Sequence, residues 1–409
     1  MQLELFEAVR EVYEESKSNV SQGQLYSEVA RKLGVNPNDH VKKVGKSQAS
    51  HNLFHRKIRW CQMALKQQKL IENVSKGTWR LTGKEKEKIT VIEQGKSILA
   101  MSTKLGIAIC AKAETVFNEG IIKEDINLVL TSLPYPLQNP RLYGGPSDEK
   151  QWVDFIMTVL EPIIKRLGEG ASMLLNIGQD CFLEGLCAKK LHIERLTIAL
   201  VDAGLFLVDR IAWASNKIPS PYFYACKIKK LLLAGYEPCL WLTNNPKALR
   251  SDNQRVLLPH SEKHKKYVAR GGVKKASHSG DGAHIKSQGD FGTLSKGKIP
   301  TNVVYIPNKC KDNEMVNAYA DALGIVRHGA KFPTNLARFF IKLLSREGDF
   351  VVDPMAGTLN VGHAAEELNR KWVNIDMVWD YVRQGFIRFE KYDAYYNPAF
   401  LNPPLIRAA

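Results

Sequence analysis

The sequence predicts an α/β domain preceded by a small, separate α+β domain. From Ile126 onward, short apolar runs alternate with amphipathic stretches of helical spacing, a pattern typical of a largely parallel sheet covered by helices. Residues 1–88 lack this alternation and indicate three helices followed by a hairpin. At 409 residues, of which 44% are hydrophobic, the chain is long enough to bury a core in each domain.

The first 88 residues contain, in order, the elements of a winged helix. Apolar residues recur at helical spacing in three stretches, and the second stretch ends at Gly34, a residue type common at helix ends. The segment after the third stretch alternates about Lys76-Gly77, as a two-stranded wing does. The predicted elements are helices over residues 3–13, 22–34 and 51–70 and a hairpin over residues 71–82.

The third of these helices is basic. It carries Arg56, Lys57 and Arg59, which we expect to contact the phosphates or the major groove of DNA. The alternative is a winged helix that contacts protein or forms dimers.

The elements of the α/β domain follow a charged segment. The run KEKEK at 84–88 leads into a semi-apolar stretch, and we expect residues 89–121 to be a connector. The strands predicted after it cover residues 127–131, 172–176, 206–213, 238–243, 302–306, 350–353 and 372–376. The predicted helices cover residues 152–167, 193–203, 335–344 and 361–368.

The positive charge of the chain is concentrated in two segments. The formal net charge is +16, yet residues 31–80 alone carry 12 Lys or Arg against 2 Asp or Glu. Residues 241–300 carry 12 against 4, so the rest of the chain is close to neutral. Focused charge of this kind favours binding to a nucleic acid over a basic surface kept for solubility.

Composition also excludes several classes of protein. No apolar run is long enough to span a membrane, and the N-terminus lacks the layout of a signal peptide. The seven cysteines are odd in number and contain no CxxC pair, which indicates reduced thiols and neither disulfides nor a zinc site. We therefore expect a soluble, cytoplasmic protein.

Two motifs follow predicted strands and carry candidate chemistry. Thr131-Ser132-Leu133-Pro134-Tyr135 ends one strand, and Asp353-Pro354-Met355-Ala356-Gly357-Thr358 ends another. Asp376 closes the next strand, about where an acidic residue binds ribose hydroxyls in nucleotide-binding sheets. Ligands of open α/β sheets bind beyond the carboxyl ends of the strands, so both motifs are placed to form a site.

Together these motifs resemble the β group of the DNA amino-methyltransferases. HGAKFP (328–333), followed by GDFVVDPMAGTLNVGHAAEELNRKWVNID (348–376), is similar to the cofactor half of that family, and TSLPYPL (131–137) resembles its TSPPY catalytic motif. The resemblance covers roughly residues 105–395 and implies a Rossmann-like, S-adenosylmethionine-dependent sheet. It divides the domain into a catalytic half at 122–243, a basic target-recognition insert at 244–300 and a cofactor-binding half at 301–409.

The resemblance also implies roles for the catalytic residues. Ser132, Leu133, Pro134 and Tyr135 form the catalytic segment. Ser132 and the Leu133 carbonyl would accept hydrogen bonds from the amino group of a base, and Tyr135 would stack on that base once it is flipped out of the duplex. Serine in this motif resembles N4-cytosine enzymes, so methylation of cytosine N4 is expected and methylation of adenine N6 is the alternative.

The cofactor implied is S-adenosyl-L-methionine, and no metal is expected, because positioning supplies most of the rate when the leaving group is a sulfonium. The residues that match the cofactor motifs are Lys331, Phe332, Pro333, Asp353, Pro354, Ala356, Gly357, Thr358 and Asp376.

Two departures from the family pattern bear on activity. Leu133 stands where the family usually has proline, and Leu359 and Asn360 replace small residues near the cofactor. A homologue that binds DNA without catalysis is therefore an alternative.

The expected partners are double-stranded DNA and, by resemblance, a cognate restriction endonuclease. In the basic insert, DNA contacts are expected from Arg250, Arg255, Lys263, Lys265, Lys266 and Arg270.

Overall fold

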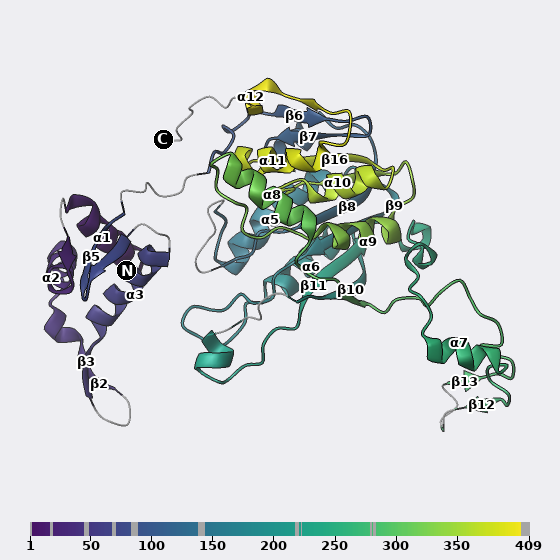
Figure 1. Ribbon diagram of the computed structural model, residues 1–409, viewed down its shortest axis with the longest axis horizontal. Coiled ribbons are helices and arrows are strands. Elements are labelled where there is room, and N and C mark those ends of the chain that lie inside the picture. The colour runs from purple at the N-terminus through teal and green to yellow at the C-terminus, as the bar shows by residue number, and fades with distance from the viewer. Residues whose placement is uncertain are drawn as a thin grey trace. The chain divides into compact units, whose positions relative to one another are not determined.

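The protein forms two compact units, residues 1–88 and 89–409 (Figure 1). The computed structural model describes residues 2–401 except 17–18, 45–48, 68–70, 83–88, 138–143, 217–220, 222, 279 and 281–283. The charged run at 84–88 thus lies outside the described residues.

The first unit is built from three helices and a three-stranded sheet. The side chains of Val9, Leu25, Ile58 and Leu65 are fully or almost fully buried in its core. Helices, helical turn and strands are α1 (Gln2–Glu15), β1 (Val20–Ser21), α2 (Gln22–Leu33), η1 (Pro37–His40), β2 (Val41–Val44), β3 (Ala49–Asn52), α3 (Leu53–Gln67), β4 (Ile71–Ser75) and β5 (Thr78–Leu81). The sheet has the order β1-β5-β4, and the β2–β3 hairpin, which the sequence analysis did not predict, lies just before α3. Three helices followed by a hairpin are the expected order of elements.

Side-chain caps fix the ends of the helices in this unit. Ser21 and Gln24 form a reciprocal capping box at the start of α2, and Gly34 ends it in the left-handed conformation. The Asn52 side chain accepts a hydrogen bond from the His55 amide at 3.0 Å. This cap explains why α3 begins at Leu53 and not at His51 as predicted.

The second unit is built on a ten-stranded mixed sheet of order β14-β10-β11-β9-β8-β15-β16-β7-β6-β17 (Figure 1). Strands β9, β8, β15, β16 and β7 are parallel, whereas β11 runs antiparallel to both of its neighbours. The strands are β6 (Ile98–Ser102), β7 (Gly106–Cys110), β8 (Ile126–Ser132), β9 (Leu167–Asn176), β10 (Phe206–Ala214), β11 (Tyr236–Thr243), β14 (Val303–Tyr305), β15 (Phe350–Asp353), β16 (Lys371–Asp376) and β17 (Tyr395–Tyr396). Each strand predicted between residues 127 and 376 is found in this sheet.

Helices cover both faces of the sheet, because its central strands are apolar on both sides. Val351 of β15 packs in one core with α9 and α10, and its neighbour Val352 packs in the opposite core with α5 and α6. The helices are α4 (Ala113–Asn118), α5 (Glu149–Ile164), α6 (His192–Asp202), α8 (Lys311–Ala322), α9 (Thr334–Leu344), α10 (Asn360–Glu367), α11 (Trp379–Gly385) and α12 (Pro398–Leu401), with short helical turns η2 (Phe223–Lys227) and η5 (Phe386–Phe389).

The basic insert has little regular structure. It contains η3 (Pro246–Ala248), η4 (Asn253–Val256), α7 (Glu262–Ala269) and a short hairpin of β12 (Ser277–His278) and β13 (Ile285–Lys286). An antiparallel bridge between Leu258 and Lys298 joins the two ends of the segment that carries α7 and this hairpin.

The expectation of a connector at residues 89–121 was wrong. This segment supplies β6, β7 and α4, and β7 pairs in parallel with β16 over five residues. Its apolar residues are therefore part of the main core, and the second unit begins at Ile89.

Helices α8 and α11 were also not predicted. The Asp148 side chain caps α5 by accepting hydrogen bonds from two amides, so α5 begins before Trp152.

The chain reverses direction across the sheet between β8 and β15. From β8 it passes through α5 to β9 on one side, and from β15 it passes through α10 to β16 on the other. A crevice forms at such a switch point, beyond the carboxyl ends of the two strands. TSLPY follows β8 and DPMAGT follows β15, so the topology brings the two motifs to the same crevice.

Candidate active site

A cavity of about 280 Å³ lies at this switch point. It brings together residues that are more than 240 positions apart in the sequence, from Ser132 to Asp376. The predicted site residues that line it are Ser132, Leu133, Pro134, Tyr135, Lys331, Phe332, Asp353, Pro354, Ala356, Gly357, Thr358 and Asp376. Pro333 does not line the cavity; it is buried at the start of α9, where it fixes the backbone that follows Phe332.

The catalytic segment keeps a defined turn although Leu133 replaces a proline. The Leu133 side chain is only 2% exposed and packs in the core beneath α5. Its amide donates to the Asn176 carbonyl at 3.1 Å, and the Pro134 carbonyl accepts from the Trp152 indole at 2.7 Å. Burial and these two hydrogen bonds fix the conformation of the segment, a role that the proline ring would otherwise have.

Polar partners from neighbouring strands orient Ser132 and Tyr135. The Ser132 hydroxyl donates to Asn176 Oδ1 at 3.0 Å, and the Tyr135 hydroxyl donates to Glu237 Oε2 at 3.1 Å. Gly178 leaves room for the Tyr135 ring, because a Cβ at that glycine would lie 2.4 Å from the ring. Sequence reasoning missed these three partners. The sequence contained two signals for them. Asn176 is a polar residue at the end of a predicted strand, and Glu237 is a lone carboxylate directly before the start of another.

The cofactor side of the cavity is formed by the turn after β15 and the end of β16. Gly357 has φ +51°, a conformation that glycine adopts readily, and its amide donates to Asp376 Oδ2 at 2.7 Å. The Val378 amide donates to the other oxygen of Asp376 at 2.8 Å. Asp353 accepts a hydrogen bond from the Met355 amide at 3.1 Å and shapes the same turn.

Both carboxylates of this turn have unusual acidity. Burial raises the pKa of Asp353 to about 7, and it raises the pKa of Asp376 to about 6. Backbone amides that donate to each carboxylate oppose this rise. A glycine turn that permits close approach, together with an acceptor at the end of the next strand, fits the ribose and methionine parts of S-adenosyl-L-methionine.

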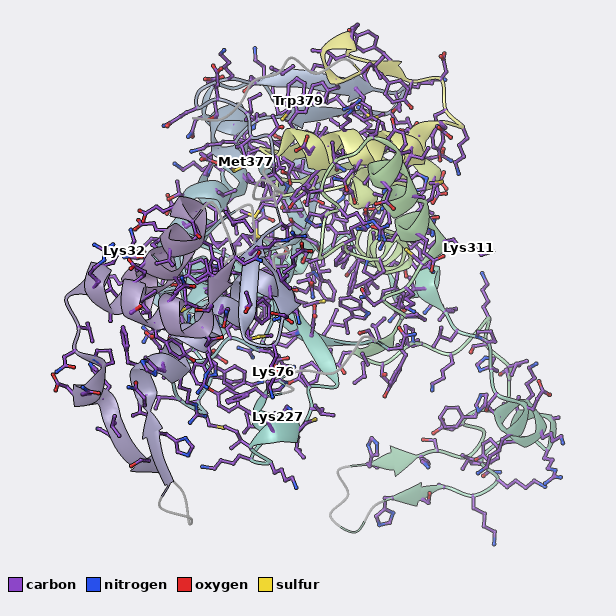
Figure 2. The ribbon with its side chains drawn as sticks, turned by 60° about the vertical axis from the view of Figure 1, so that its left-hand side comes forward. Lys32, Lys76, Lys227, Lys311, Met377 and Trp379 are labelled. Carbon is purple, nitrogen blue, oxygen red and sulfur yellow. The ribbon has the colours of Figure 1, made fainter. Side chains whose placement is uncertain are left out.

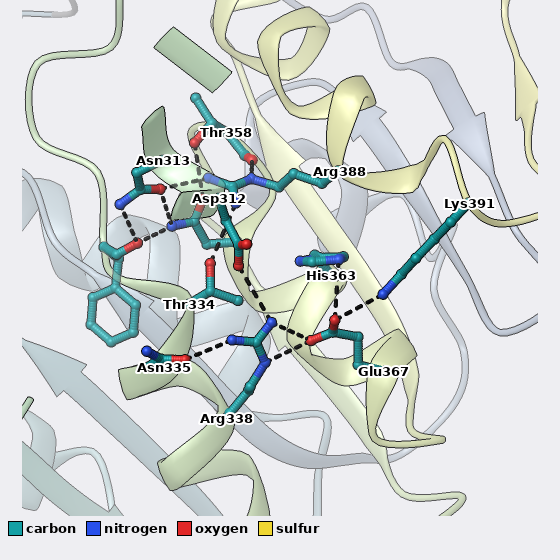
Figure 3. Close-up of polar contacts among 12 residues, drawn as sticks. Asp312, Asn313, Thr334, Asn335, Arg338, Thr358, His363, Glu367, Arg388 and Lys391 are labelled. Atoms are coloured by element: carbon teal, nitrogen blue, oxygen red, sulfur yellow. Dashed lines mark hydrogen bonds and ion pairs between the residues drawn. The ribbon is translucent and has the colours of Figure 1, made fainter. Parts of the chain in front are cut away.

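A buried polar network links the Phe332 carbonyl to this turn, and Figure 3 shows its contacts among Asn313, Thr358 and Arg388. The side-chain NH₂ group of Asn360 donates a hydrogen bond to the Phe332 carbonyl. The same group donates to Asn313 Oδ1 at 3.3 Å. Arg388 is 2% exposed and donates to the Thr358 carbonyl at 2.8 Å and to Asn313 at 2.7 Å (Figure 3). The Asn360 that departs from the family pattern is therefore the residue that joins the two cofactor motifs.

Leu359, the other departure, is also accommodated by the fold. It has φ +60° and is fully buried, and its side chain occupies the space above Gly385. A Cβ at Gly385 would lie 2.5 Å from Leu359 Cγ. The larger residue next to the cofactor turn is thus matched by a glycine on α11.

Lys331 lies at the rim of the cavity in a positively charged setting. Burial, together with the nearby Arg388 and Arg327 guanidinium groups, lowers the pKa of Lys331 to about 8. Its ammonium group donates to the His328 carbonyl at 2.5 Å. Met377, which follows Asp376, lines the cavity as well.

The residues predicted to contact DNA fall into three groups. Arg56, Lys57 and Arg59 are exposed on α3, and Lys76 is exposed at the turn of the β4–β5 hairpin (Figure 2). The exposed basic residues of the α7 segment are Lys263, Lys265, Lys266 and Arg270.

Arg250 and Arg255 form the third group, and the structure places them differently from the expectation. Arg250 forms a salt bridge with Asp349 at 2.5 Å, and Arg255 donates to the Ser345 carbonyl at 2.5 Å. Both guanidinium groups bind the start of the insert to the segment between α9 and β15. We therefore withdraw them as DNA contacts.

The described part of the chain offers neither a metal site nor a membrane span. Among the described residues, no cluster of three or more His, Cys, Asp or Glu side chains is arranged to hold a metal ion. Within the same residues, no helix combines the length and the apolarity needed to cross a membrane.

Comparison with known proteins identifies the family. A family model described as DNA methylase matches residues 126–386, which include both motifs and the strands between them. The chain belongs to the DNA methylase family. The fold class and the family predicted from the sequence are therefore confirmed.

Two relatives of this DNA methylase are informative. The chain is 30% identical over 273 residues to the Type II methyltransferase M.PvuII of Proteus hauseri, which covers 66% of this chain and 80% of the relative. It is also similar to the solved structure of the PvuII DNA methyltransferase (cytosine-N4-specific), with a TM-score of 0.54 and 26% identity over 70% of this chain and 87% of that one. A separate model, the Mrr N-terminal domain, matches residues 2–90 of the methylase.

Proposed function

We propose that this DNA methylase transfers a methyl group from S-adenosyl-L-methionine to N4 of a cytosine in double-stranded DNA. The observation that carries the proposal is the common cavity, in which Ser132 of the catalytic segment and the Gly357–Asp376 turn lie together. The similarity to a cytosine-N4-specific methyltransferase supports the choice of base.

The residues of the catalytic segment act on the amino group of the base. The lone pair of an exocyclic amino nitrogen is delocalised into the ring, so the nitrogen is a weak nucleophile. Ser132 and the Leu133 carbonyl accept hydrogen bonds from the amino hydrogens and direct the lone pair toward the methyl group. Tyr135, seated on Gly178, stacks on the base after it has left the duplex.

The cofactor-side residues hold the methyl donor. Asp376 would accept hydrogen bonds from the ribose, and Gly357, which has no side chain, would leave its backbone accessible to the cofactor. When bound, S-adenosyl-L-methionine would supply a methyl group carried on a sulfonium, a leaving group that would keep the S–C bonding pair while N4 bonds to the methyl carbon. N4 then loses a proton to solvent. Most of the rate comes from holding the two reactants together.

DNA binding is assigned to two basic surfaces. We propose that the residues of α3 (Arg56, Lys57 and Arg59) and those of the α7 segment (Lys263, Lys265, Lys266 and Arg270) neutralise phosphates, which releases counterions. A restriction endonuclease of the same recognition sequence is the proposed functional partner, and DNA modified by the methylase should resist its cleavage.

The test uses the purified protein, S-adenosyl-L-methionine and unmethylated DNA, followed by digestion to nucleosides and mass spectrometry. We expect N4-methyldeoxycytidine from the wild-type protein and about 100-fold slower formation of it from the Ser132→Ala variant. N6-methyldeoxyadenosine as the product would assign the enzyme to adenine, and no product from a protein that binds the cofactor would identify a DNA-binding homologue without catalysis.

A further inference from the structure

Glu237 is a buried carboxylate next to the catalytic segment. It is only 7% exposed and lies near the start of β11. Because β11 runs antiparallel to β9, with Cys239 opposite Asn176, the start of β11 lies beside the carboxyl ends of the parallel strands. A charged side chain is costly to bury unless it accepts hydrogen bonds, so its partners indicate its purpose.

Two of those partners belong to the catalytic site. Glu237 Oε2 accepts from the Tyr135 hydroxyl at 3.1 Å, and Asn176 Nδ2 lies 3.4 Å from the same oxygen. The other end of the Asn176 amide, Oδ1, accepts from the Ser132 hydroxyl at 3.0 Å. The four residues therefore form a continuous chain of hydrogen bonds from Glu237 to the reacting end of the cavity.

The carboxylate sets the direction of this chain. An ionised glutamate can only accept hydrogen bonds, so the Asn176 amide must turn its NH₂ group toward Glu237 and its oxygen toward Ser132. Ser132 has a single hydroxyl hydrogen, which this arrangement commits to Asn176. The lone pairs of Ser132 Oγ are then left to accept a hydrogen bond from the cavity side.

We propose that Glu237 is a positioning and specificity-determining residue that makes Ser132 an obligate hydrogen-bond acceptor. This inference rests on the proposed function. An obligate acceptor favours a base that presents an amino group, as cytosine does at position 4, and disfavours a base with a carbonyl there, such as uracil or thymine. The carboxylate acts through Asn176 and does not touch the base.

The test is a glutamine in place of the glutamate. Glu237→Gln keeps the shape but introduces a donor, which can turn the Asn176 amide around and force the Ser132 hydroxyl hydrogen into the cavity. We expect methyl transfer at saturating substrates to fall roughly 10- to 100-fold, the effect of losing one hydrogen bond to the reacting group. The dissociation constant for the cofactor should stay within about twofold, because the hydrogen bond that is lost is one to the base. Glu169→Gln, an exposed residue near the other end of β9, is the matched control and should leave the rate unchanged.

A second substitution separates hydrogen-bond direction from simple packing. Asn176→Asp in the Glu237→Gln background places an acceptor-only group between the introduced glutamine and Ser132, so the Ser132 hydroxyl must again donate away from the cavity. The double variant should recover most of the lost rate. Glu237→Gln should also lower the urea midpoint of unfolding, because neutral hydrogen bonds replace the charge-assisted ones to the carboxylate. The double variant restores a carboxylate to the chain and should recover the midpoint, a measurement that needs no methyl transfer.

Each outcome decides the matter. Full activity of Glu237→Gln, or a deficit in rate and urea midpoint that Asn176→Asp does not repair, would overturn the assignment. If the wild-type protein methylates no DNA, the proposed function fails, while the urea midpoints still decide whether Glu237 sets the direction of the hydrogen bonds.

Discussion

Ser132 and Asp376 lie in one cavity, and their replacement should have different effects. Ser132→Ala removes an acceptor for the amino group, so we expect methyl transfer to fall about 100-fold, or roughly 3 kcal/mol of transition-state stabilisation. Its cofactor affinity should stay within about twofold of wild type. Single-turnover kinetics and calorimetry test the two parts. Unchanged turnover would contradict the catalytic role of Ser132.

Asp376 should control cofactor affinity in a way that depends on pH. Its pKa of about 6 in the cofactor-free protein means that the carboxylate ionises between pH 5 and 7. The ionised form is the better acceptor for ribose hydroxyls, so affinity should increase with pH over this window and then level off. Asp376→Asn should weaken binding about 10-fold and flatten the profile, as measured by calorimetry. An equally steep profile in the variant would assign the titration to another group, such as Asp353.

The same carboxylate should make the folded protein less stable as pH rises, whereas its effect on cofactor affinity is an increase with pH. Because the fold raises the pKa of Asp376 above its ordinary value, the folded protein holds this proton more tightly than the unfolded chain does. Its contribution is fully present below the unfolded pKa and is lost as pH rises through about 6. Urea unfolding of the cofactor-free protein should show a smaller loss of stability over this range in Asp376→Asn than in wild type.

Sequence reasoning identified the side chains that face the cavity but not those behind them. Ser132, Gly357 and Asp376 could be predicted because family motifs mark them at strand ends. Asn176 and Glu237 could not, since their role comes from the pairing of β9 with β11, and pairing between distant strands leaves no local pattern. Arg250 and Arg255 show the converse, because a basic residue in a basic segment carries no sign that it forms an internal contact.

At the scale of elements, the residue that precedes α10, Leu359, packs against Gly385 at the end of α11. Gly385→Ala would place a Cβ 2.5 Å from Leu359 Cγ, and such overpacking should cost about 1–3 kcal/mol. Urea unfolding measures this cost, and Leu359→Ala in the same chain should relieve part of it. Gly235→Ala, where a Cβ meets nothing within 4 Å, is the control. Equal stability of the Gly385 and Gly235 variants would show that the contact imposes no constraint.

The two basic elements should contribute separately to DNA binding. Replacing Arg56, Lys57 and Arg59 of α3 by alanine should reduce the slope of log affinity against log salt by up to about 3, because each phosphate contact contributes nearly one unit. Replacing the basic residues of the α7 segment should reduce it independently. Arg31→Ala, which alters a residue paired with Glu28, is the control. An unchanged slope in the α3 variant would mean that this helix does not contact phosphates.

The strands of the main sheet were predicted within the alternation of strands and helices over residues 126–376 and were missed outside it. Strand β15 spans only four residues, Phe350–Asp353, and was predicted. The segment from Ile98 to Cys110 consists of two five-residue strands with a three-residue turn, and it was interpreted as a connector. Its place in the sheet is set by the pairing of β7 with β16, more than 260 residues away in the sequence, which no local pattern reveals.

At the scale of the whole molecule, the order of the two motifs along the chain explains where the site lies. The catalytic half comes first and the cofactor half last, yet β8 and β15 are neighbours in the sheet. The switch point between them makes one cavity from both halves and leaves the basic insert between β11 and β14 as an addition to the fold. This arrangement could be predicted from family motifs, whereas no motif of the chain predicts which DNA sequence is recognised.

The most direct test of the central claim is to map modified bases in a cell that lacks other DNA methylation. The wild-type protein and the Ser132→Ala variant would each be expressed with a plasmid, and the DNA would be read by single-molecule sequencing. We predict N4-methylcytosine at one recurring sequence with the wild-type protein and a much smaller modified fraction of the same sites with the variant. Methylated adenine at the recurring sequence, or unmodified DNA in the presence of a folded protein that binds S-adenosyl-L-methionine, would contradict the account.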